Sequence, residues 1–463
     1  MSPMTSSAAP FLLAWPVAGL VIFAVARPGR ALILTYLLGQ MILPETSIQI
    51  SGLPDLDKWA VCGIAAVLGT VLFRPHAVTR WRFHWTDVPL SIFIIGSALT
   101  SVVNQLGIYD GVSASLLQVF RYALPFWLAR VHLQTREDLL DAATTFALCG
   151  AVYAIPALWE WRMSPHIHQT FYGFFQHAWR QHYRWGFWRP IVCFPHALPL
   201  SFFFAATSLA SLWLLRARLL PNFWGLPAKL VAAASIVALV ATMTFSGYLA
   251  FALGLGVWLL WQRLQLRSAL LIPLVLATFW MTSRYLGWID DEFVVDKVRW
   301  VSAERAESIE YRLVAEQAYL AKARQNWLFG LGAWGRANVE GLAADALWMI
   351  LASTYGLLGL ISFMTWWMGN IIDAWRHAPH WAPDVRQVAA LWATLSGLLA
   401  VDFLVNGFPS PAVIIGAGGV CAISAATADA RRIRASRVRK RRAAAPTKAA
   451  VHRPVGSPQP RTP

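Results

Sequence analysis

Arg312 and Asp345 are the residues of this chain whose types and surroundings most favour chemistry. Arg312 lies in a charged segment expected to be helical over 303–324, and Asp345 stands where a long apolar segment begins. Between them, the run 329–332 (FGLG) contains glycines, which allow backbone turns that other residues resist. A guanidinium binds phosphate oxygens through paired hydrogen bonds, and a carboxylate can accept a proton from a hydroxyl group. The pair therefore predicts chemistry on an anionic, lipid-linked substrate.

Both residues also have plainer interpretations. Glu316 follows Arg312 by four residues, so the two could form a surface ion pair, which contributes little energy. A carboxylate at a helix N-terminus is stabilised by the helix dipole, so Asp345 also suits a helix cap. Arg121 and Asp402 lie inside apolar segments that we expect to span the membrane, where such groups either pair with one another or face a ligand.

The elements that must position these residues are membrane helices. The chain is 57% hydrophobic and 13% charged, against about 25% charged residues in a soluble domain. Apolar runs approach the length of about 20 residues that spans a hydrocarbon core, and such runs must be helical. We expect an all-α, polytopic fold of 12–13 spans over residues 1–430, similar to GT-C membrane glycosyltransferases. The predicted spans are 11–26, 31–48, 59–73, 87–103, 112–130, 139–158, 190–215, 229–244, 246–261, 268–283, 345–372, 387–405 and 411–428.

Basic residues predict the orientation of these spans, because Lys and Arg accumulate in cytoplasmic loops. Every second connection is basic, as is the tail 431–463, which we expect to be disordered and cytoplasmic. The net charge of +16 then needs no nucleic acid, since anionic lipids attract such segments. Two sizeable loops, 159–189 and 284–344, fall on the outer side.

The outer loop 159–189 carries more arginines than the charge rule favours. It holds Arg162, Arg180, Arg184 and Arg189 with a single acid, Glu160, among many aromatic residues. Arginines bind phosphate, so this loop suits a sugar phosphate. An interfacial aromatic belt is the competing interpretation.

Two further patterns bear on metals and redox chemistry. Asp55 and Asp57 could form a metal-binding DxD pair, but two carboxylates do not complete a metal shell. The four cysteines are scattered, which favours buried apolar roles. We expect no metal and no cofactor.

The order of these motifs resembles the O-antigen ligase and polysaccharide polymerase superfamily (Wzy-type), in its exopolysaccharide polymerase-like branch. The resemblance rests on Tyr311-Arg312, on FGLG at 329–332, on Asp345 and on the GLLG step at 356–359. The ligase branch has His-Asn where this chain has Asp345-Ala346.

Four further segments resemble the same family: SGLPDLDKWAV at 51–61, FRYALPFWLAR at 120–130, RPIVCFPHALP at 189–199 and TMTFSGYLA at 242–250. Two depart from the family pattern, with Val192 for a glycine and Gly247 for an arginine. Arg189 or Arg184 would then supply the missing charge.

The resemblance implies an inverting, metal-independent glycosyltransferase at the outer face of a bacterial inner membrane. Its donor would be an undecaprenyl-pyrophosphate-linked glycan and its acceptor a glycan or lipid, with other polysaccharide-assembly proteins as further candidate partners. Arg312, Arg189, Arg121 and Arg184 would bind the pyrophosphate, His196 and Tyr311 would contact substrate, and Asp345 would act on the acceptor hydroxyl.

Two other classes stay open on the sequence alone. A flippase or transporter for lipid-linked oligosaccharides would show internal repeats and charges along mid-membrane helices. A non-enzymatic component of a polysaccharide assembly system would not need Arg312 and Asp345 together. Whether those two side chains converge distinguishes these classes best.

Overall fold

The computed structural model describes residues 8–50, 54–184, 186–223, 225–300 and 302–444. Within these residues the chain is helical almost throughout, so the all-α prediction is confirmed. Each predicted span contains a helix. Residues 51–53 of the segment resembling the family, the side chain of Arg180 and the tail 445–463 lie outside the described part of the chain.

The first half of the chain contributes the helices α1 Ala9–Val25, α2 Pro28–Ile42, α3 Lys58–Phe73, α4 Pro75–Val78, α5 Asp87–Val103, α6 Ile108–Gln118, the π-helical turn η1 Val119–Ala123, α7 Leu124–His132, α8 Arg136–Met163, α9 Ile167–Tyr172 and the 3₁₀ turn η2 Trp179–His182. A two-residue antiparallel hairpin follows, with β1 Tyr183–Arg184 paired to β2 Phe187–Trp188.

The second half contributes α10 Ala197–Arg216, α11 Ala228–Ala241, α12 Phe245–Arg263, η3 Arg267–Leu271, α13 Ile272–Leu286, α14 Asp291–Arg299, α15 Ala303–Gln325, α16 Trp334–Ala337, α17 Leu347–His377, η4 Ala378–His380, α18 Pro383–Asp402 and α19 Pro411–Ala444.

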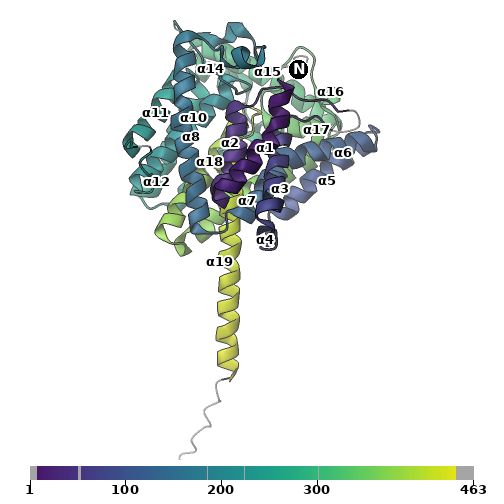
Figure 1. The fold of residues 1–463 in the computed structure, drawn as a ribbon. Coiled ribbons are helices and arrows are strands. Elements are labelled where there is room, and N and C mark those ends of the chain that lie inside the picture. Colours follow the sequence, from purple (N-terminus) through teal and green to yellow (C-terminus); the bar gives the residue numbers. More distant parts are fainter. Residues whose placement is uncertain (1–7, 51–53, 185, 224, 301, 445–463) are drawn as a thin grey trace, which may run out of the picture.

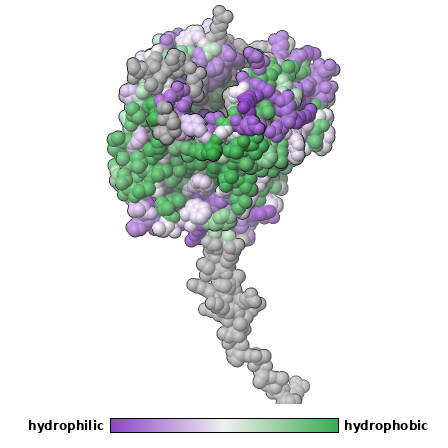
Figure 2. Space-filling view, turned by 90° about the vertical axis from the view of Figure 1, so that its right-hand side faces the viewer, coloured by the Kyte–Doolittle hydropathy of each residue, from purple (hydrophilic) through white to green (hydrophobic). Residues whose placement is uncertain are grey.

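The surface of the molecule has the layering of a membrane protein. In the part of the chain that the structure describes, six helices are long and apolar enough to cross a membrane, and four shorter helices are also apolar. Figure 2 shows a hydrophobic band across the middle of the face in view, with polar surface above and below it. Water is absent from a bilayer core, so such a band is stable only against lipid or another apolar surface.

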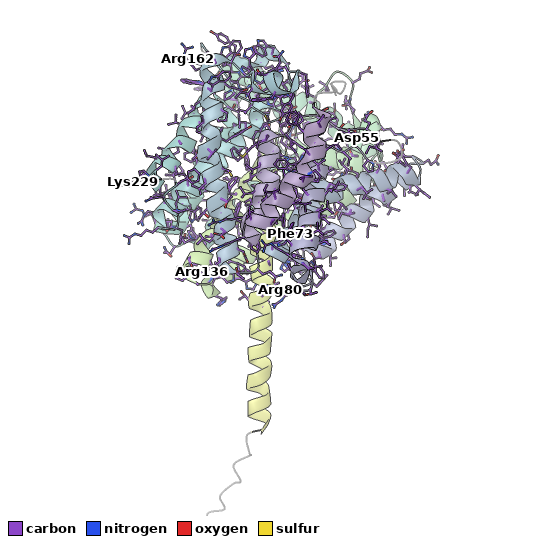
Figure 3. The ribbon with its side chains drawn as sticks, in the orientation of Figure 1. Asp55, Phe73, Arg80, Arg136, Arg162 and Lys229 are labelled. Carbon is purple, nitrogen blue, oxygen red and sulfur yellow. The ribbon has the colours of Figure 1, made fainter. Side chains whose placement is uncertain are left out.

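The two polar ends of the body carry different parts of the chain. α19 leaves one end and projects far from the body (Figure 1). Arg80 and Arg136 lie near that end, which we call the tail end, whereas Arg162 lies at the opposite end (Figure 3). Lys229 lies at the side of the body, between the two ends.

Several boundaries differ from the sequence expectation for identifiable reasons. α2 ends at Ile42, because Pro44 follows and disfavours helix in the residue before it. α10 begins at Ala197 and not at 190, since Pro190 and Pro195 interrupt the segment between. α19 continues to Ala444, so residues 431–444 are helical where we expected disorder. Alanine and arginine, which dominate this stretch, are strong helix formers.

A break inside α17 determines how the loop after α15 meets the bundle. Gly356 has φ +64° and ψ −166°, a backbone conformation that interrupts the helix. The 327–332 segment docks into this break: Leu331 and Gly332 donate to the carbonyls of Ser353 and Thr354, 2.9 Å each. Leu357 and Leu358 donate in return to the carbonyls of Trp327 and Leu328.

Glycine is required on both sides of this docking. A Cβ on Gly330 would come within 2.5 Å of the Gly356 nitrogen, and a Cβ on Gly356 within 2.4 Å of the Leu328 oxygen. The FGLG and GLLG segments therefore form one structural unit, which joins the loop after α15 to the middle of α17.

Candidate functional site

Arg312 and Asp345 come together at the junction of α15 and α17. Arg312 Nη2 lies 3.8 Å from Asp345 Oδ2, and their side chains are 28% and 42% exposed. This separation exceeds the usual hydrogen-bonding distance. Among the described residues, no donor hydrogen-bonds to the Asp345 carboxylate, so its oxygens keep their capacity to accept hydrogen bonds.

Asp345 does not cap α17. The N-cap residue is Ala346, and no side chain caps this helix end. The backbone carbonyl of Asn406 accepts from Leu347 N–H at 3.2 Å, so it provides a partner for one of the N–H groups that have none within the helix. The helix-cap interpretation of Asp345 is therefore wrong.

The ion pair proposed within α15 is also absent. Glu316 binds Arg284 of α13, which in turn contacts Asp291 at the start of α14. Both Glu316 and Arg284 are buried, and burial raises the pKa of Glu316 while Arg284 opposes that shift. Because Glu316 pairs with Arg284, it does not pair with Arg312, and Arg312 lies beside Asp345 instead.

Tyrosines of α15 fix the loop that precedes Asp345. Tyr311 Oη accepts a hydrogen bond from Ala343 N–H at 3.1 Å, and Tyr319 donates to Asn338 Oδ1 at 2.6 Å. Tyr311, expected to bind substrate, therefore holds the backbone two residues before Asp345. Tyr311 and Arg312, which are consecutive in α15, thus contact the backbone of this loop and the Asp345 carboxylate respectively.

The 403–407 segment between α18 and α19 forms the floor of the pair. Arg312 Nη1 donates to the Val405 carbonyl at 3.2 Å. A Cβ on Gly407 would lie 3.0 Å from the Asp345 carbonyl oxygen, so this close approach favours glycine. Asp402 accepts from Asn406 at 2.6 Å and is close enough to Arg312 for their charges to interact.

His196 links this pair to the loop 159–189. Its Nδ1 accepts from Leu198 N–H at 3.0 Å, which caps α10. Its ring lies 4.2 Å from the ring of His177. Burial lowers the pKa of His196 to about 3, and the charges of Arg189 and Arg312 contribute. His196 is therefore neutral at physiological pH and lies within electrostatic reach of both arginines.

Arg189 is buried beside the first turn of α12. It donates to Thr244 Oγ1 at 3.0 Å and to the Gln181 carbonyl at 3.3 Å. Gly247, the position where the family pattern has arginine, leaves no room for a side chain, since a Cβ would lie 2.9 Å from Ser201. Arg189 thus brings a positive charge to the segment that lacks its own.

Glu160 organises the backbone that follows Arg189. Its buried carboxylate accepts from the N–H groups of Ile191 and Val192 at 2.9 and 2.8 Å. Val192 has φ +49°, a conformation that costs a β-branched residue energy and favours glycine. Arg184 lies on β1, half-buried, and acts electrostatically on His182.

A cavity of about 640 Å³ lies on the other side of the 407–409 segment. Its charged lining comprises Glu45, Asp57, Lys58 and Arg121. Phe408 forms part of the wall and stacks on His196, with ring centroids 6.2 Å apart. Arg312 and Asp345 are not among the lining residues, so Arg121 and Arg312 occupy adjoining regions and not one cavity.

Within the cavity the charged residues are partly paired. Asp57 caps α3 by accepting from Trp59 and Ala60, and lies 3.8 Å from Arg121. Asp55 accepts from Ser47 Oγ at 2.9 Å, so the two aspartates of the DxD pair serve separate local contacts. Lys58 is buried and binds Glu45 and the Cys193 carbonyl. Sequence reasoning missed Lys58 and Glu45, although Lys58 at the start of an apolar helix was a usable signal.

The electrostatics of Asp345 suit a proton acceptor. Partial burial raises the pKa of its carboxyl group above the ordinary value, and the nearby Arg312 opposes that increase. A higher pKa makes a carboxylate a stronger base, while the cation keeps it ionised at neutral pH.

Comparison with known proteins adds no identification. The chain matches no protein-family model, and no curated protein sequence matches it.

Proposed function

We propose that this protein transfers a glycan from an undecaprenyl-pyrophosphate donor to an acceptor hydroxyl at the outer face of a bacterial inner membrane, in polysaccharide synthesis. The observation that carries the proposal is the Arg312–Asp345 pair. A cation and a carboxylate that accepts no hydrogen bond from the described residues meet at a loop–helix junction, where both side chains are partly exposed.

The reaction would be a single displacement. The acceptor oxygen forms a bond to the anomeric carbon while the bond from that carbon to the pyrophosphate oxygen breaks. The leaving undecaprenyl pyrophosphate takes the electron pair, and the acceptor proton passes to Asp345. Negative charge grows on the pyrophosphate, so Arg312 and Arg189 would stabilise this charge as the bond breaks.

The adjoining cavity supports a role for Arg121 in binding the acceptor glycan and not the pyrophosphate. The cavity mixes Arg121, Asp57, Lys58 and Glu45 with aromatic walls, which suits polar sugar hydroxyls. Its wall at Phe408 reaches His196 and thereby the donor side.

Purified protein in lipid nanodiscs, supplied with lipid-linked glycan, tests this proposal directly. Arg312→Ala should abolish transfer, and Arg312→Lys should also impair it, because a point charge does not copy a planar fork. Arg299→Ala is the matched control, since Arg299 forms an exposed pair with Asp296 of little energetic value. Normal transfer by Arg312→Ala, at equal protein abundance, would remove Arg312 from the site.

The outer location of the site has its own test. All four native cysteines are buried, so engineered cysteines report without background. An impermeant maleimide added to intact spheroplasts should label Arg299→Cys and leave Arg80→Cys unlabelled. The reverse pattern would place the Arg312–Asp345 pair in the cytoplasm and overturn the proposal.

A further inference from the structure

A second group of chemically active side chains includes a residue near the end of α17, whereas Asp345 precedes the start of that helix. His84 precedes α5, Asp373 lies near the end of α17 and Cys421 lies in α19. Their ligand atoms all lie within 4.8 Å of one another, and all three residues are buried. In the described part of the chain this is the group of His, Cys, Asp and Glu residues close enough to hold one metal ion.

The orientation of His84 leaves one ring nitrogen facing the other two residues. Its Nδ1 lies 2.8 Å from Thr86 Oγ1, and its Nε2 lies 2.9 Å from Asp373 Oδ2. The Thr86 N–H donates to Nδ1 at 3.4 Å, so without a metal Nε2–H donates to Asp373, and a metal would displace that proton to bind Nε2. Metal-binding histidines characteristically use their second nitrogen in such an outer contact.

Both oxygens of Asp373 lie beside polar groups. Its Oδ1 accepts from Trp85 Nε1 at 3.4 Å, and its buried Oδ2 lies 2.9 Å from His84 Nε2. The oxygen and the ring nitrogen that face one another are therefore close enough to bind the same cation.

The ligand set and its charge select the metal. Nitrogen, sulfur and carboxylate oxygen together are typical zinc ligands, at about 2.0–2.3 Å from the ion. A neutral imidazole, a carboxylate and a thiolate carry two negative charges, which balance one divalent cation. The complex would therefore be neutral, which matters where buried net charge is expensive. Trp85, next to His84, is 38% exposed, so the group lies just beneath the surface.

We propose that His84, Asp373 and Cys421 bind a zinc ion that ties the start of α5 to α17 and α19. This site is independent of the proposed glycan transfer, because α17 separates Asp345 at its start from Asp373 near its end. The zinc would be a structural clamp, since metal binding stabilises whichever state holds the ligands together.

The test uses the full chain, purified in detergent without chelators and without a polyhistidine tag. Elemental analysis should find about one zinc per chain, and cobalt substitution should give a thiolate-to-cobalt charge-transfer band. Cys421→Ser and Asp373→Asn should each lower zinc affinity more than about tenfold, the minimum typical even for outer contacts of metal sites. Cys149→Ser is the matched control, because Cys149 is also buried but lies in α8, outside the group.

Two results would overturn the proposal. One is wild-type protein that purifies without metal and shows neither a cobalt band nor a higher melting temperature with added zinc. The other is zinc that Cys421→Ser retains with unchanged affinity. Since wild-type protein alone decides the first result, a variant that fails to fold does not leave the question open. If Cys421→Ser loses zinc but still transfers glycan, the zinc proposal is supported and the proposed function is unaffected.

Discussion

Two arginine–aspartate pairs in this molecule use the same chemical groups in opposite ways. Arg130 of α7 binds Asp87 of α5 directly, and both side chains are almost wholly buried. The same guanidinium also donates to the Arg82 carbonyl. Arg312 and Asp345 remain 3.8 Å apart and partly exposed, with the carboxylate unoccupied.

The difference teaches how to separate structure from function in such pairs. Asp87 accepts from Arg130 and from the His84 N–H, and Arg130 also donates to the Arg82 carbonyl, although its buried Nε has no hydrogen-bond partner among the described residues. Burial closes this pair to a ligand. The Arg312–Asp345 pair is partly exposed, and its carboxylate can still accept hydrogen bonds. Burial of both partners indicates a role in holding helices together, whereas partial exposure of a well-positioned pair favours a ligand.

The largest expected effect comes from breaking the buried pair. Arg130→Ala leaves Asp87 buried without its cation, which should cost about 3–5 kcal/mol of stability. Thermal unfolding in detergent measures this cost, with Arg136→Ala as a control at a more exposed pair. A melting temperature within a degree of wild type would mean that the buried pair is not structural, and the contrast would fail.

The exposed pair should behave in the opposite way. Asp345→Asn keeps the shape of the side chain but cannot accept a proton, so transfer should fall by roughly a hundredfold or more. Stability should change little, because Asp345 caps no helix and accepts no hydrogen bond from the described residues. Near-normal glycan growth by this variant would leave a positioning mechanism without a protein base. Asp296→Asn is the control carboxylate.

The docked break in α17 should be sensitive to a single methyl group. Gly356→Ala forces a Cβ against the Leu328 carbonyl in a backbone region that only glycine favours, at a cost of about 1–3 kcal/mol or more. Gly256→Ala provides the control, since nothing lies within 4 Å of its Cβ position and alanine favours a helix. Equal melting temperatures for the two variants would contradict the docking.

The smallest expected effect is a dependence of stability on pH, which comes from His182 and His196. Burial lowers the pKa of His182 to about 4 and of His196 to about 3, below about 6.5 in the unfolded chain. The unfolded chain then binds more protons below pH 6.5, so stability should fall as the pH falls from 6.5 towards 4. His196→Asn should weaken this dependence, as melting curves at pH 7.5, 5.5 and 4.5 can show. An unchanged slope would exclude His196 as a contributor.

The helices could be predicted because the physics behind them is local. An apolar run in lipid must satisfy its own backbone, so run length alone located helices such as α3, α5 and α12. Proline also acts locally, and Pro44 and Pro195 mark boundaries that a stricter reading of the sequence would have found. The extension of α19 to Ala444 is not predicted, because the basic composition of residues 431–444 favours disorder while their alanines and arginines favour a helix.

The partners within the site could be predicted only in part. The family resemblance brought Arg312 and Asp345 forward together, and the structure places them side by side. The resemblance gave no sign that Glu316 binds Arg284 or that residues 403–407 lie beside the Arg312–Asp345 pair. Such contacts join residues far apart in the chain, and periodicity within one segment carries no information about them.

The floor beneath Arg312 has a consequence for the order in which the protein matures. Translation supplies Arg312 and Asp345 well before Val405, whose carbonyl accepts from Arg312, and Gly407, which passes close to the Asp345 backbone. Both side chains are therefore made before this support exists, and the arrangement that we propose to be catalytic is completed only when α18 and α19 have been added. A chain that the ribosome releases before residue 405 would carry Arg312 and Asp345 without their support. We expect such an incomplete chain to be inactive.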